Sequence, residues 1–127
     1  MLERKWFVKL ITSLFILNAV LLLLHEIESA YEKEWEILKL PGKITGFLLL
    51  HIPVIFLMLY GAIEVEKLSV AGMIIGIIFG IGGIIPLIVH KVLVKRKGKF
   101  DLPISNIIIY VNAVAGVATM ICIVRLF

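Results

Sequence analysis

Four long stretches of this sequence carry almost no charge, and they restrict the possible folds more than any other feature. They cover residues 6–24, 44–63, 68–89 and 102–124, and Lys9 is the only ionised side chain among them. A helix needs roughly 20 apolar residues to cross the hydrocarbon core of a bilayer, and each stretch is about that long. Lys9 lies close to one end, from which a long side chain reaches the membrane surface.

Composition indicates lipid, rather than water, as the solvent. Of the 127 residues, 61% are hydrophobic and 17% are charged, whereas soluble domains are about half apolar and about a quarter charged. A soluble fold of this length has no room to bury so much apolar surface. The sequence therefore predicts an all-α integral membrane protein, a four-helix bundle forming a single transmembrane domain over residues 1–127. Its helices are expected over about residues 6–25, 44–63, 68–90 and 102–125.

The connections between these helices predict which ends share a side of the membrane. With four crossings, the first connection (residues 25–43) and the third (residues 90–101) lie together, opposite the short turn 64–67 and both termini. The first side holds eight basic residues and the other side five, and the positive-inside rule then places the first and third connections in the cytoplasm. The eight are Lys33, Lys39, Lys43, Lys91, Lys95, Arg96, Lys97 and Lys99, and the five are Arg4, Lys5, Lys9, Lys67 and Arg125. We expect a multi-pass protein of the cell membrane.

The first connection has a helical pattern of its own. Its apolar residues recur at helical spacing, namely Ile27, Tyr31, Trp35 and Leu38. This pattern predicts an amphipathic extension of the first helix, or a short helix lying in the membrane interface. Pro41 and Gly42 then end it before the second spanning helix begins.

A ridge of glycines follows one face of the third stretch, where Gly72, Gly76 and Gly80 recur at intervals of four. Such a ridge lets a neighbouring helix approach closely. Because the motif is generic, packing inside the bundle is the favoured interpretation. The alternative is contact with a second copy of the chain or with a partner in a membrane complex. Otherwise the expected partners are membrane lipids, and no motif indicates nucleic-acid binding.

Polar side chains are costly inside a membrane, so the few present are the candidates for function. Those within or beside the apolar stretches are Asn18, His25, Glu26, Glu28, His51, His90, Asn106 and Asn112. His51 lies eight residues after Lys43, which is about 12 Å along a helix. His25 and His90 lie at the ends of their stretches that meet the first and third connections. We therefore expect all three histidines in one half of the membrane.

These residues are candidates for a metal site. His25 and Glu28 are three residues apart and share a helix face. Imidazole and carboxylate suit a divalent metal such as Zn²⁺, Mn²⁺ or Fe²⁺, and Glu26 or Glu34 then acts as the catalytic base on a bound water. The predicted ligands are His25, Glu28, His51 and His90. For such scattered residues a merely structural polar cluster is the more common outcome, and a substrate or proton pathway is the third alternative. The single cysteine, Cys122, excludes an internal disulfide and a cysteine-based zinc site.

Residues 25–35 read HEIESAYEKEW, and Leu40, Pro41 and Gly42 follow shortly after. This segment resembles a family of small four-span membrane proteins of unknown function that carry an H-E-x-[DE]-x-A-Y-x-x-E-W signature. Over the rest of the chain the resemblance is in hydropathy only. It implies a membrane fold and a functional first connection, with His51 and His90 outside the signature. The positions it marks are His25, Glu26, Glu28, Tyr31, Glu34 and Trp35.

Three functions follow from these patterns, and the sequence leaves open whether the protein is an enzyme. The first is a membrane-embedded metal-dependent enzyme acting on a lipid-like or amphipathic substrate. The second is a non-catalytic subunit or scaffold that packs through the glycine ridge. The third is a small transporter, which needs a continuous polar path. Residues 68–89 supply almost no polar side chains for such a path, so this function ranks last.

Overall fold

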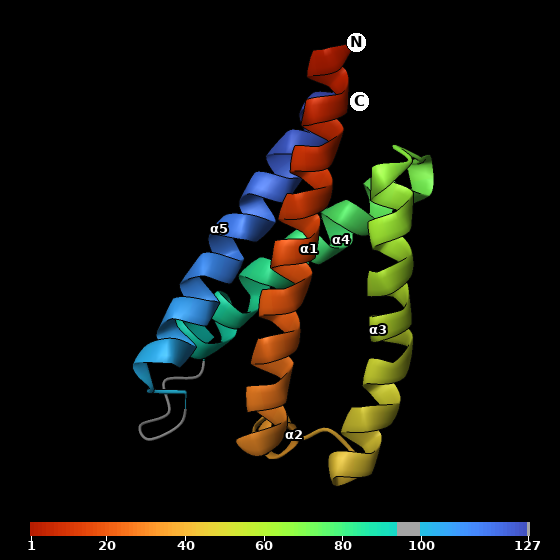
Figure 1. Ribbon diagram of the computed structural model, residues 1–127. Helices are drawn as coiled ribbons and strands as arrows, with labels where there is room; N and C mark the ends of the chain where they lie inside the picture. The colour runs from red at the N-terminus through yellow and green to blue at the C-terminus, as the bar shows by residue number, and fades with distance from the viewer. Residues whose placement is uncertain (94–99, 127) are drawn as a thin grey trace.

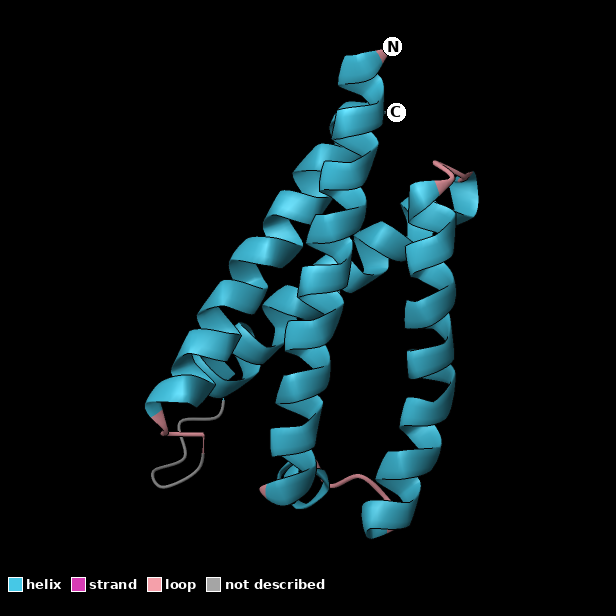
Figure 2. Ribbon diagram, viewed as in Figure 1, coloured by secondary structure: helices cyan, strands magenta, loops and turns pink. Residues whose placement is uncertain are grey.

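The computed structural model describes residues 1–93 and 100–126, which form helices joined by short connections, with no strand. The elements are α1 (Leu2–Tyr31), α2 (Glu34–Ile37), α3 (Lys43–Glu66), α4 (Val70–Ile88), the π-helical turn η1 (Val89–Leu93) and α5 (Pro103–Leu126) (Figure 1). Figure 2 shows how little of the chain lies in loops. The predicted all-α fold is confirmed.

Four helices are long and apolar enough to cross a membrane: α1, α3, α5, and α4 continued by η1. The termini lie together at one end of the bundle, and the connection α1–α3 lies at the other end, together with the start of α5 (Figure 1). The chain is thus built as a multi-pass membrane protein. Its predicted orientation remains a prediction, and the basic residues at positions 95, 96, 97 and 99 lie outside the described residues.

The predicted extension of the first helix is present in two parts. Helix α1 continues to Tyr31, and the short helix α2 follows after a sharp reversal. Of the apolar residues in this region, Ile27 and Tyr31 are exposed at 67% and 84%, whereas Trp35 is buried. Its ring centroid lies 5.7 Å from that of Phe47 on α3. The extension therefore presents apolar side chains outward and anchors its second part through Trp35.

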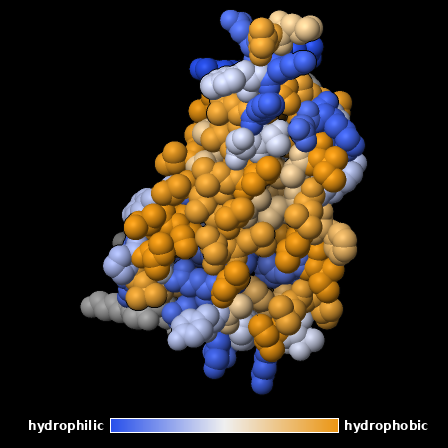
Figure 3. Space-filling model, in the orientation of Figure 1, coloured by the Kyte–Doolittle hydropathy of each residue, from blue (hydrophilic) through white to orange (hydrophobic). Residues whose placement is uncertain are grey.

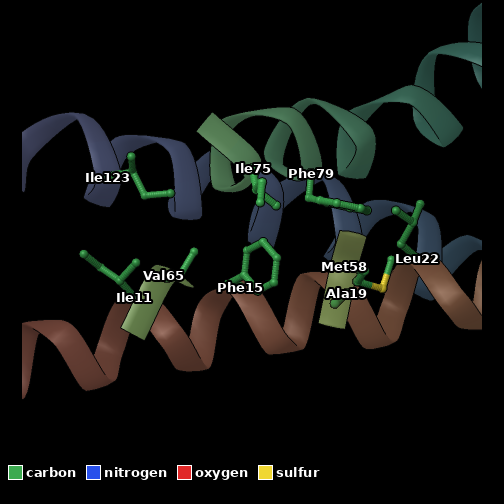
Figure 4. Packing of buried hydrophobic residues seen from close by; sticks show 9 residues of the cluster. All are labelled: Ile11, Phe15, Ala19, Leu22, Met58, Val65, Ile75, Phe79 and Ile123. Carbon is green, nitrogen blue, oxygen red and sulfur yellow. The ribbon is translucent and has the colours of Figure 1, made fainter. Parts of the chain in front are cut away.

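The apolar core lies where α1 crosses α4, with residues from α3 and α5 completing it (Figure 4). At its centre Phe15 is fully buried, and its ring meets that of Phe79 edge-on, with the centroids 5.9 Å apart. In lipid, burying apolar side chains gives little hydrophobic stabilisation, so close van der Waals packing holds such a core together. The cluster consists of Ile11, Phe15, Ala19, Leu22, Met58, Val65, Ile75, Phe79 and Ile123.

The glycine ridge packs inside the chain. Gly72, Gly76 and Gly80 are all buried. A methyl group added at Gly76 would overlap Ile123 of α5, and one added at Gly116 would overlap the carbonyl oxygen of Gly80. The ridge is thus occupied by the chain's own helices, as the favoured interpretation predicted. Contact with a second copy of the chain or with a partner in a membrane complex stays a prediction.

We expect Gly116→Ala to destabilise the bundle, because the new methyl group would force α4 and α5 apart. Overpacking of this kind costs about 1–3 kcal/mol. Gly82→Ala is the matched control, since its methyl group would meet only Leu22, at 3.6 Å. The measurement is the thermal unfolding midpoint of each variant in detergent micelles, followed by circular dichroism. Equal midpoints for the two variants would show that the crossing of α4 and α5 is not close.

Candidate metal centre

A cavity of about 260 Å³ lies between α1, α2, α3 and α4, at the end of the bundle away from the termini. Its polar lining comes from three histidines and two glutamates: His25, Glu26, Glu34, His51 and His90. In the space-filling view, hydrophilic side chains are visible on both sides of α1 in this lower part of the molecule, within an otherwise hydrophobic surface (Figure 3). The structure therefore brings all three histidines to one cavity.

Helix α1 supplies the first histidine through its buried face. Asn18, Leu22, His25 and Ser29 are all buried, and their spacing of four, three and four residues places them on one side of the helix. His25 is only 2% exposed. Its Nε2 atom lies 3.4 Å from the Ser29 hydroxyl, one turn further along, while its Nδ1 atom has no hydrogen-bond partner in the described part of the chain.

The second histidine, His90, belongs to the π-helical turn η1. This turn follows Pro86 of α4, whose ring has no N–H to donate to the preceding turn. A π turn is closed by a hydrogen bond that spans one more residue than in an α-helix, so it changes the direction of the side chains that follow. Such turns are frequent at functional sites. The His90 ring lies against that of His25, with centroids 5.0 Å apart and planes at 66°.

The carboxylate of Glu34 reaches the histidines because the chain reverses between α1 and α2. Lys33 adopts a left-handed conformation with φ 55° and ψ 49°, and its N–H donates to the Ala30 carbonyl at 3.3 Å. The reversal turns Glu34 back onto α1, where it is 7% exposed. One of its carboxylate oxygens, Oε1, then lies 3.0 Å from Nε2 of His90.

Together, His25, Glu34 and His90 have the arrangement of metal ligands. One ligand atom from each lies within 4.8 Å of the others. Two ligands of one zinc ion at 2.0–2.1 Å are at most about 4.2 Å apart, so these side chains would move slightly closer together around an ion. Nε2 of His90 contacts the Glu34 carboxylate, whereas the Nδ1 atom of His25 has no hydrogen-bond partner among the described residues. Buried nitrogens normally have a partner, and a shared cation would satisfy both imidazoles and the carboxylate at once.

The electrostatic surroundings of Glu34 favour its charged form. Burial by itself would raise the pKa of this carboxyl group. The contacts with His90 and Ser29, and the charges of His90 and His25, outweigh burial and hold the pKa of Glu34 below its usual value. The residue is therefore a carboxylate at neutral pH, which is the form that binds a metal.

A second imidazole–carboxyl pair lies in the same cavity. Nε2 of His51 on α3 is 2.9 Å from Oε2 of Glu26 on α1, and Nδ1 of His51 is 2.7 Å from the Phe47 carbonyl oxygen. A carbonyl oxygen only accepts, so Nδ1 carries a proton and donates it. The contact between Nε2 and Glu26 must then contain one further proton, held by the ring or by the carboxyl group. The pair thus shares a single transferable proton beside the metal-ligand cluster.

Phe100 covers the two clustered imidazoles. Its ring centroid lies 4.0 Å from that of His90 and 5.6 Å from that of His25. The side chain is 4% exposed. The backbone of Phe100 has φ 56°, a left-handed conformation that is uncommon for a bulky residue and is found most often at functional sites. Sequence reasoning missed Phe100, because a single phenylalanine after a basic segment carries no recognisable signal.

Glu28, the predicted carboxylate ligand, lies on another side of α1. It is turned about 60° from His25 around the helix, and its Oε1 accepts a hydrogen bond from the Ser105 hydroxyl on α5. The structure places Glu34 next to the histidines instead. His51, another predicted ligand, lies across the cavity with Glu26 and outside the cluster of three. Glu34 was predicted only as a base.

Two of the three predicted asparagines connect helices to one another, and the third is buried. Asn18 donates from Nδ2 to the Phe79 carbonyl oxygen at 2.7 Å, and Asn106 accepts a hydrogen bond from Lys91 of η1. Asn112 is fully buried on α5, with no partner for its amide among the described residues. Asn18 thus joins α1 to α4 and Asn106 joins α5 to η1, and none of the three asparagines lines the cavity.

We expect Phe100→Ala to increase the rate at which diethyl pyrocarbonate modifies His25 and His90, because the substitution removes the ring that covers both imidazoles. Phe56→Ala is the matched control, since Phe56 is 72% exposed on α3. Peptide mass spectrometry measures the modification of each histidine. Unchanged rates in Phe100→Ala would mean that this ring does not close the site.

A family model matches residues 11–126 of the chain, which is nearly its whole length, and its description is a family of unknown function, DUF6713. The match includes the segment HEIESAYEKEW and extends well beyond it, and it confirms the resemblance to such a family. The chain matches no curated protein and no solved structure. The comparisons therefore assign no substrate and no reaction, and the site geometry is the basis for a functional proposal.

Proposed function

The chain belongs to DUF6713, a family of unknown function, and we propose from its geometry that it is a membrane-embedded metal-dependent enzyme. The observation that carries the proposal is the cluster of His25, Glu34 and His90, whose ligand atoms lie within 4.8 Å of one another. All three residues also line the cavity, so a metal held by them would be accessible to a substrate there.

The ligand set defines the class of metal. Two imidazoles and one carboxylate are the ligands of several catalytic zinc sites, and they also suit Fe²⁺ and Mn²⁺. Three protein ligands leave at least one coordination position for water or substrate. The Ser29 hydroxyl beside His25 supplies the kind of outer hydrogen bond that orients a metal-bound imidazole. The metal would lower the pKa of a bound water and polarise a substrate oxygen.

The Glu26–His51 pair gives this centre a group that accepts and returns a proton. In a hydrolytic reaction, the pair takes one proton from a water molecule as the water oxygen attacks the substrate. It then returns that proton to the leaving group as the bond breaks. One water is consumed, and the pair ends with the single shared proton that it held at the start. We assign Glu26 this role rather than Glu34, because Glu34 faces the imidazoles as a ligand.

The other functions have less support. A subunit docking through the glycine ridge lacks a free ridge, since Gly76 and Gly80 face α5. A transporter needs polar groups along its whole path. In the described chain, the deep asparagines Asn18 and Asn112 do not line the cavity that contains the histidines. A purely structural polar cluster is the remaining alternative, and metal analysis separates it from the proposal.

We expect one divalent metal ion per wild-type chain, and we expect Glu34→Gln to lower its affinity by more than about 100-fold, because losing a direct ligand costs more than losing an outer hydrogen bond. Glu28→Gln is the matched control, since Glu28 lies about one turn after His25 on α1 and contacts Ser105 on α5. Elemental analysis of purified protein gives the metal content, and competition with a chelator gives the affinity. Equal retention in the two variants, or a metal-free wild type, would refute the assignment.

We expect Glu26→Gln to keep the metal and to slow hydrolysis by about 10²–10⁴-fold, because general acid–base catalysis contributes that much. The assay is a panel of long-chain fatty esters, amides and phosphoesters presented in mixed micelles with metal-loaded protein. The control is Glu32→Gln, a change on the connection outside the cavity lining. Hydrolysis at the wild-type rate by Glu26→Gln, or none by the wild type with any of these substrates, would contradict the assigned role.

A further inference from the structure

The cavity continues from the metal-ligand cluster towards the centre of the bundle, and there its wall is apolar. Leu22 lies one turn inward from His25 along α1, and Ile85 and Gly82 lie inward from His90 along α4. The eight residues between Gly82 and His90 correspond to about 12 Å along a helix. We propose that this inner end, formed by Leu22, Gly82 and Ile85, binds the hydrocarbon chain of the substrate.

Gly82 differs from the other glycines of α4 in what surrounds it. A methyl group added at Gly80 would overlap Met120, and one at Gly83 would overlap the Asn18 side chain. At Gly82 the same group would meet only a methyl of Leu22, at 3.6 Å, which is ordinary contact. Helix packing therefore does not require glycine at this position. Its effect is to leave space in the wall of the cavity.

The shape and chemistry of the cavity favour one class of occupant. About 260 Å³ is slightly below the range of about 300–1,000 Å³ that holds drug-sized ligands, so the cavity suits one hydrocarbon chain rather than two. The polar groups lie at one level, where a metal and the Glu26–His51 pair meet the substrate. The substrate is therefore a single-chain amphiphile whose chain is attached to an oxygen-bearing group, as in a fatty ester or fatty amide.

Entry from the membrane follows from the same arrangement. Such an amphiphile already resides in the bilayer, and the cavity lies within helices long enough to span it. Transfer from lipid to an apolar wall brings little hydrophobic gain, so the fit of the chain decides binding. The protein is therefore expected to select substrates by the length of their hydrocarbon chain. One missing or extra methylene in an apolar pocket changes binding or rate by about 10–200-fold.

The inference depends on the proposed metal centre, and its test uses the metal as a reporter. The protein is loaded with Co²⁺ in lipid nanodiscs, and its visible absorption is followed during titration with alkyl hydroxamic acids, whose head group chelates metals. With concentrations expressed per lipid, we expect decanohydroxamic acid to bind at least about tenfold more tightly than acetohydroxamic acid. Equal binding of the two would overturn the inference while leaving the metal centre intact.

Gly82→Leu fills the inner end. We expect it to retain Co²⁺ and acetohydroxamic acid binding, and to lose at least about tenfold in affinity for decanohydroxamic acid. Ala118→Leu is the control, because Ala118 lies in an apolar groove of α4 and α5 outside the cavity. Unchanged binding of the long chain by Gly82→Leu would overturn the inference.

A second variant keeps the test decisive if Gly82→Leu fails to fold or loses its metal. Ile85→Ala enlarges the inner end, and half of the Ile85 side chain is already exposed. We expect this variant to shift the preferred hydroxamic acid to a longer chain. An unshifted preference would overturn the inference, whereas a wild type that binds no Co²⁺ would overturn the proposed function and the inference together.

Discussion

The convergence of Glu34 with His25 and His90 is the arrangement on which this account depends. Lipid offers no hydrogen bonds, so polar groups inside a membrane protein need partners within the protein or a bound ion. Here two imidazoles and one carboxylate converge, and the Nδ1 atom of His25 and the Nε2 atom of His90 have no hydrogen-bond partner among the described residues. A divalent cation would bind both imidazole nitrogens, and without it His90 has only its contact with Glu34 and the Nδ1 atom of His25 has no partner among the described residues.

The rest of the fold holds this contact in place. The close crossing of α4 and α5 at Gly80 and Gly116 fixes the helix that continues into η1 and carries His90. The buried Trp35 next to Phe47 anchors α2, which begins with Glu34. The site is therefore assembled by elements that are far apart in sequence, and each is fixed by packing that does not itself involve the ligands.

Much of the fold could be predicted, because it follows from the absence of charge in four segments of suitable length. The spacing of His25 and Glu28 did not identify the carboxylate that lies beside the histidines. Helical spacing predicts the direction of a side chain only to within a fraction of a turn. Glu28 faces Ser105 on α5, and Glu34 reaches His90 only because Lys33 adopts a left-handed conformation. Neither that reversal nor the π-helical turn before the third connection has a periodic pattern, so the sequence could not show them.

X-ray absorption spectroscopy of the metal in purified protein tests the central claim most directly. The account predicts nitrogen and oxygen ligands at about 2.0–2.2 Å, with the outer-shell scattering of two imidazoles and no sulfur. A spectrum with the scattering of no imidazole or only one, or a protein that binds no divalent metal at all, would contradict it.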